Sequence, residues 1–154
     1  MVDKRLISKR DITIELFQLE NGNAHLEANF LDPYHLIRME MEVEPNSRKI
    51  VKATATMPNS PFRACPVVLK RMSSLRGLVI GKGVMREVAK RVGGALGCVH
   101  LRELTLEVIN FAATSLIGYD QGLGLMSKAY SQKSDEERFQ MSKDMLKGTC
   151  RIYS

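Results

Sequence analysis

The sequence lacks the short motifs that most directly indicate an enzyme. It has no Gly-x-Ser-x-Gly, Cys-x-x-Cys or His-Glu-x-x-His segment. Gly77-x-x-x-Gly81-Lys82-Gly83 is too short for a phosphate-binding loop and has glycine where serine or threonine must reach magnesium. Only three histidines occur in 154 residues, so candidates for general-base catalysis are few. A non-enzymatic function is therefore the favoured interpretation.

Long apolar runs and paired cysteines are also missing. No stretch approaches the roughly 20 apolar residues of a membrane span, and the chain is polar again by Ser8-Lys9-Arg10, unlike a signal peptide. Three cysteines cannot all pair within one chain, and a domain of this length can bury a core without disulfides. With 44% hydrophobic residues the chain is not disordered. We therefore expect a cytoplasmic protein with reduced thiols and no membrane partner.

Charge is divided unevenly along the chain, which carries +6 overall. Residues 15–44 hold seven acids and one base, a net charge of −6, whereas residues 63–91 hold eight bases and one acid, a net charge of +7. The basic stretch is either the solvated side of amphipathic helices or a surface for an anionic partner such as nucleic acid. No aromatic residues alternate with the bases, as they would in a single-strand binding platform, so nucleic acid is the second choice.

Four segments in the first part of the chain have the pattern of β-strands. Apolar and polar residues alternate at 12–16, 24–31, 37–44 and 50–57, although Val51 is out of phase in the last segment. Turn signals separate them at Asn21-Gly22-Asn23, Asp32-Pro33 and Pro45-Asn46-Ser47. Short connections predict an antiparallel four-stranded meander with one acid-rich face and a second face that needs a cover.

The period becomes helical from Cys65 onward. The pattern predicts a short helix at 66–72, a second at 84–92 and a long central helix at about 99–117. Gly93, Gly94 and Gly97 indicate a flexible link before the long helix. The predicted fold class is α+β, with the antiparallel four-stranded meander followed by a helical layer packed on one face.

The domain organisation predicted from these patterns is a single domain in three parts. Residues 1–118 form the α+β core, residues 119–133 a linker, and residues 134–154 a C-terminal helix and tail of the same domain. Ser134 and Glu137 have the spacing of a capping box, which predicts where the last helix starts. That helix would present Phe139, Ser142, Met145 and Leu146 on one face and end at Gly148.

Two thiols stand at predicted helix starts and are candidate metal ligands. Cys65 precedes Pro66, and Cys98 follows Gly97. The positive end of a helix dipole favours thiolate, the form that binds metal or attacks an electrophile. The alternative for each thiol is a small buried cap without a ligand.

A histidine and a loop complete the candidate set. His100 lies two residues after Cys98, and such residues point about 200° apart on a regular helix, so Cys98 must precede the helix if both face one site. Asp32 and His35 occupy the turn between the second and third strands, at an end of the sheet that the helix starts could reach. The sequence therefore predicts a metal site formed by Cys65, Cys98, His100, His35 and Asp32.

Two other functions stay open. The chain could be an interaction module, acting as a homodimer, with a protein partner or with nucleic acid, in which the cysteines are structural. An enzyme with Cys98 as nucleophile and His100 or another histidine as base ranks last, because Cys98 and His100 lie on the same short stretch and no third group can be assigned to orient the histidine.

The segments Pro61-x-x-x-Cys65-Pro66 and Gly97-Cys98-x-His100-Leu101 resemble those of a bacterial protein family of unknown function. The likeness covers most of the chain, from the first strands to Thr149-Cys150. Members of that family tend to continue past this point, which leaves the role of Cys150 open.

A more remote likeness is to the iron–sulfur cluster scaffold proteins of the nitrogen-fixation and general assembly systems. That resemblance implies one ligand after the second strand, at Asp32 or His35, one at Cys65, and a pair at Cys98 and His100. This chain has no cysteine in the first loop, and its pair is separated by one residue. Such a mixed ligand set would suit zinc as well as an iron–sulfur cluster.

Overall fold

The computed structural model describes residues 2–117, 128–144, 146–148 and 151–153. The chain forms two compact units, residues 1–111 and residues 112–154, and the division falls within the longest helix. None of the helices in the described ranges is both long enough and apolar enough to cross a membrane. The candidate site lies entirely in the first unit.

The first unit is built on a four-stranded antiparallel sheet in the order β1-β2-β3-β4. The strands are β1 (Asp11–Gln18), β2 (Ala24–Leu31), β3 (Leu36–Glu44) and β4 (Lys49–Asn59). Each follows its neighbour in the chain through a short turn, so the predicted meander is confirmed.

One face of this sheet is apolar because alternate residues point to the same side. Leu26 of β2 is paired with Met41 of β3, Phe30 is paired with Ile37, and all four are fully buried. Between β3 and β4 the register shifts, since Val43 is opposite Ile50 while Glu42 is opposite Lys52. Val51 is the extra residue of this bulge, which explains why it broke the alternation in the sequence.

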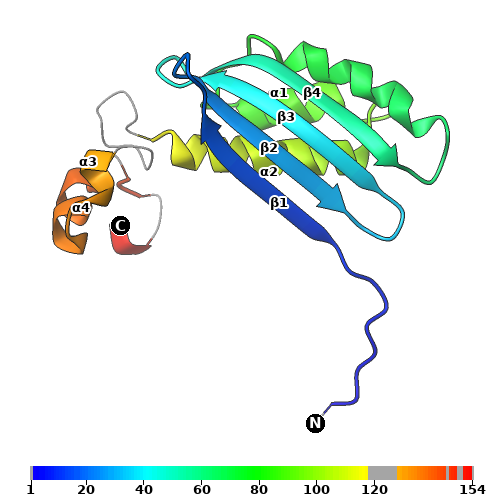
Figure 1. The fold of residues 1–154 in the computed structure, drawn as a ribbon, viewed down its shortest axis with the longest axis horizontal. Coiled ribbons are helices and arrows are strands. Elements are labelled where there is room, and N and C mark those ends of the chain that lie inside the picture. Colours follow the sequence, from blue (N-terminus) through cyan, green and yellow to red (C-terminus); the bar gives the residue numbers. More distant parts are fainter. Residues whose placement is uncertain (1, 118–127, 145, 149–150, 154) are drawn as a thin grey trace. The chain divides into compact units, whose positions relative to one another are not determined.

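Three helices cover the apolar face (Figure 1). They are the 3₁₀ helix η1 (Cys65–Leu75), α1 (Val84–Val92) and α2 (Val99–Ser115). The buried side chains of the layer recur at helical spacing, as in Val84, Val88 and Val92 of α1. The α+β class and the helical layer on one face are therefore confirmed. Helix α2 ends two residues earlier than the expected 117.

The second unit contains short helices. They are α3 (Lys128–Ser131), α4 (Asp135–Ser142) and η3 (Arg151–Tyr153). Ser134 and Glu137 form the expected capping box at the start of α4. This helix ends at Ser142, earlier than the expected Gly148. Of the expected linker, residues 119–127 lie outside the described residues, and so do Met145 and Cys150 of the predicted tail.

Candidate metal centre

The turn between β2 and β3 positions two of the expected ligands. Asp32 donates its backbone N–H to the carbonyl of His35, 3.0 Å away. Its carboxylate oxygen Oδ1 accepts the backbone N–H groups of Tyr34 (2.9 Å) and His35 (2.8 Å). Aspartate favours such a turn because its short side chain can bond to the backbone two and three residues on. The two backbone hydrogen bonds thereby fix the orientation of the Asp32 carboxylate within the turn.

The same carboxylate orients the imidazole of His35. The Nδ1 atom of His35 lies 2.9 Å from Oδ1 of Asp32, and the two side chains are only 10% and 9% exposed. Burial by itself raises the pKa of Asp32, but hydrogen bonds from Tyr34 and His35 outweigh it and lower that pKa. The carboxylate is therefore ionised at neutral pH, and its Oδ1 atom lies within hydrogen-bond distance of Nδ1, which fixes the imidazole beside it.

Helix α2 supplies the second imidazole, in its first turn. The ring of His100 lies with its centroid 4.0 Å from that of His35, and 5.4 Å from the ring of Phe30. Burial, followed by the proximity of His35, lowers the pKa of His100. Both causes favour the neutral imidazole, which is the form that coordinates a metal.

Three potential ligand atoms converge at this end of the sheet. One atom each from Asp32, His35 and His100 lies within 4.8 Å of the other two. Among the residues that the structure describes, no other His, Cys, Asp or Glu side chains form such a group of three or more. Two imidazole nitrogens and a carboxylate oxygen form a ligand set that suits zinc or ferrous iron.

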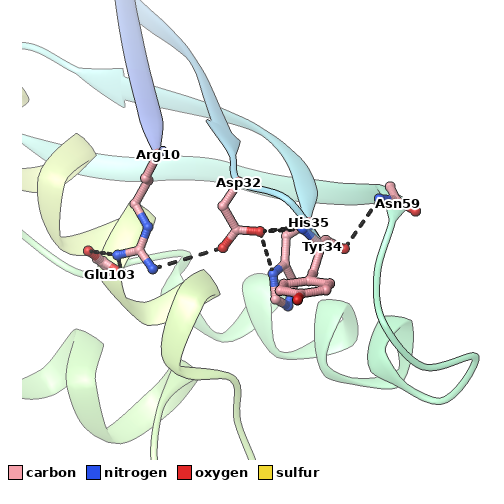
Figure 2. A network of polar contacts seen from close by, with 6 residues as sticks. All are labelled: Arg10, Asp32, Tyr34, His35, Asn59 and Glu103. Atoms are coloured by element: carbon pink, nitrogen blue, oxygen red, sulfur yellow. Dashed lines mark hydrogen bonds and ion pairs between the residues drawn. The ribbon is translucent and has the colours of Figure 1, made fainter. Parts of the chain in front are cut away.

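An arginine lies beside Asp32 and pairs with a glutamate of helix α2 (Figure 2). Arg10, which directly precedes β1, donates from one terminal nitrogen to both carboxylate oxygens of Glu103, at 2.8 and 2.9 Å. Its other terminal nitrogen lies 3.9 Å from Oδ2 of Asp32, and its guanidinium stacks 4.7 Å from the ring centroid of Phe30. The apolar ring of Phe30 thus packs against both the guanidinium of Arg10 and the imidazole of His100.

The two expected thiols are not part of the converging group. Cys65 is the first residue of η1 and donates its N–H to the carbonyl of Phe62. Cys98 directly precedes α2, as predicted, and its carbonyl accepts the N–H of Arg102. Both side chains are half-buried, free thiols. The structure therefore brings together the nitrogen and oxygen ligands of the predicted set and shows no cysteine cluster among the described residues.

Sequence reasoning missed Arg10 and Glu103. Glu103 lies three residues after His100, so helical spacing could have placed both on one face of α2. Nothing in the sequence around Arg10 indicates its position, because its partners lie up to 93 residues away along the chain.

A family model described as "Protein of unknown function (DUF2889)" matches residues 31–114, which is more than half of the chain. The chain belongs to this family. The DUF2889 region contains Asp32, His35 and His100, whereas Arg10 precedes it. The match gives no separate support to the Cys-Pro and Gly-Cys-x-His-Leu motifs, nor to the likeness with cluster scaffold proteins. No curated protein and no solved structure matches the chain.

Proposed function

We propose that this protein binds a single divalent transition-metal ion, zinc or ferrous iron, through Asp32, His35 and His100. The observation that carries the proposal is the convergence of their three ligand atoms within 4.8 Å. The low pKa of the Asp32 carboxyl and the low pKa of His100 keep both groups in the forms that bind metal. Nitrogen and oxygen ligands favour a mononuclear ion over an iron–sulfur cluster, which requires several thiolates.

Three protein ligands leave part of the coordination shell open. Zinc with three side-chain ligands keeps a fourth position for water or another small ligand, and a six-coordinate ferrous ion keeps three. Closed structural zinc sites use four protein ligands, commonly including cysteine. The site therefore fits an exchangeable ligand position better than a purely structural ion.

Metal titration with matched histidine variants tests the proposal. Protein without a polyhistidine tag should take up one equivalent of zinc or cobalt, and His35→Ala and His100→Ala should each weaken the affinity by at least about tenfold. His25→Ala is the control, because His25 is the remaining histidine of the chain and lies outside the group, with its Nε2 atom 3.4 Å from the carboxylate of Glu27 on its own strand. It should leave the affinity unchanged.

The thiols provide the contrasting result. Cys65→Ser and Cys98→Ser should retain full metal uptake, with circular dichroism to confirm folding. No uptake by the wild-type protein, or an equal loss in His25→Ala, would overturn the proposal. Loss of uptake in the serine variants alone would instead indicate a thiolate site.

A second candidate function is nucleic-acid binding by the basic stretch 63–91. Its single acid, Glu87, already pairs with Lys90 and Arg91. Arg71 and Arg91 are also engaged, because Arg71 donates to the carbonyl of Arg91 and Arg91 donates to that of Ser74. Five exposed basic side chains in this stretch have no hydrogen bond or ion pair with any other described residue: Arg63, Lys70, Arg76, Lys82 and Arg86.

Salt dependence distinguishes this function from simple solvation. Lys70→Glu and Arg86→Glu should weaken binding to duplex or single-stranded nucleic acid. Each should also reduce the slope of log affinity against log salt by about one for every phosphate that the variant no longer neutralises. Lys52→Glu, on the opposite face of the sheet, is the control. If all three variants bind nucleic acid with the same affinity as the wild-type protein, the basic side chains of this stretch only interact with solvent.

A further inference from the structure

Arg10 is held beside the proposed metal site but keeps hydrogen-bonding capacity. One terminal nitrogen is engaged by Glu103, whereas the other lies 3.9 Å from Oδ2 of Asp32, too far for a hydrogen bond. The side chain is 43% exposed. Stacking on Phe30 and the bond to Glu103 fix the guanidinium in place, so the second nitrogen can donate to a ligand without first becoming ordered.

The charges around the site favour an anion once the metal is bound. Asp32 and Glu103 contribute −2 and Arg10 contributes +1, so with both histidines neutral the cluster carries −1. A divalent ion changes this sum to +1. A monoanion would neutralise the loaded site, and a neutral ligand would leave its charge uncompensated.

We propose that the metal-loaded site binds a small carboxylate, with one oxygen on the open coordination position and the other accepting from Arg10. This inference rests on the proposed metal-binding function. A carboxylate matches the arrangement because one of its oxygens can coordinate the metal while the other accepts a charge-assisted hydrogen bond from the guanidinium. Asp32 places the metal and the guanidinium close together, since its carboxylate is a proposed metal ligand and also lies beside the second terminal nitrogen of Arg10.

Cobalt-loaded protein and two small ligands test the inference. Cobalt(II) replaces zinc and reports ligand exchange in its visible spectrum, so acetate and neutral imidazole can each be titrated at constant ionic strength. Arg10→Gln should weaken acetate binding by about five- to tenfold and leave imidazole binding unchanged. Lys9→Gln is the matched control: it removes the same charge from the neighbouring residue, whose partner is Asp11.

The outcomes separate the two proposals. If cobalt does not bind to the wild-type protein, the proposed function fails. If cobalt binds but acetate has the same affinity for wild type and Arg10→Gln, the metal site stands and the carboxylate inference fails. Equal weakening by Arg10→Gln and Lys9→Gln would also overturn the inference, because a general charge effect would then explain the weaker binding.

Discussion

At the scale of single residues, two carboxylates shape the two turns that flank β3. Asp32 accepts backbone N–H groups in the β2–β3 turn, and Glu44 does the same in the β3–β4 turn, from Asn46 at 3.0 Å and Ser47 at 2.7 Å. Hydrogen bonds from Ser47 and then Asn46 lower the pKa of Glu44 to about 2. Of the two carboxylates, Asp32 has a histidine side chain beside it, so the same turn chemistry forms part of the proposed metal site in one place and a structural turn in the other.

The Glu44 turn predicts a specific acid sensitivity. A carboxyl whose pKa is lowered on folding stabilises the protein above its unfolded value, 4.5, and that stabilisation is lost as the pH falls towards about 2. We expect the free energy of unfolding of the wild-type protein to fall more steeply across this window than that of Glu44→Gln, as measured by urea unfolding at several pH values. Glu40→Gln, an exposed carboxylate on the same strand, should follow the wild type. Parallel curves for Glu44→Gln and wild type would contradict this prediction.

At the scale of elements, the connection between α1 and α2 determines where His100 lies. The link is hydrogen-bonded, with Gly97 N–H to Gly94 at 3.1 Å and Cys98 N–H to Val92 at 3.1 Å. A side chain at Gly97 would place its Cβ 2.1 Å from the carbonyl oxygen of Val92. The glycine expected to provide flexibility is therefore required for close packing of the backbone, which in turn positions the first turn of α2.

This packing predicts that Gly97→Ala destabilises the first unit. Because the clash is with backbone atoms that cannot rotate away, we expect the free energy of unfolding to fall by at least about 2 kcal/mol. Weaker metal binding should accompany it, since His100 follows three residues later. Gly81→Ala is the control: nothing lies within 4 Å of its added Cβ, and its backbone is not left-handed. Similar denaturation midpoints for both variants would argue against this account of the link.

Strands and helix starts could be predicted where the sequence pattern involves only near neighbours in the chain. Alternation identified all four strands because one face of the sheet is buried, and the capping box located the start of α4. Val51 interrupts the alternation of apolar and polar residues because it lies in a β-bulge opposite β3. The sequence showed this interruption, but the bulge that causes it depends on pairing with the neighbouring strand. The 3₁₀ form of η1 was not predicted, since its apolar spacing is also compatible with an α-helix.

At the scale of the whole molecule, a bound metal should couple the site to global stability. Asp32 and His35 belong to the turn between β2 and β3 at the end of the sheet, and His100 belongs to the helical layer, so an ion at this point would join the two layers of the first unit. An ion bound only by the folded state stabilises it in proportion to the logarithm of its free concentration. The expected homodimer or protein partner stays a prediction at this scale.

Thermal and chemical unfolding with added zinc measure that coupling. At about 100 times the dissociation constant, zinc should raise the free energy of unfolding of the wild-type protein by about 2.7 kcal/mol. The double variant His35→Ala/His100→Ala should show no such gain, whereas His25→Ala should keep it. A zinc-dependent gain of the same size in the double variant would place the bound ion elsewhere.

The sequence by itself determined the meander, the helical cover and the position of Asp32 and His35 in a turn, because alternation, helical periodicity and turn chemistry act between near neighbours in the chain. It also indicated His100 as a candidate ligand. Only the tertiary structure decided that the imidazoles and the carboxylate converge without the thiols, and that Arg10 joins them. Those contacts depend on how the first turn of α2 is packed over the end of the sheet, which is set by the backbone contact at Gly97 and by side chains far apart in the chain.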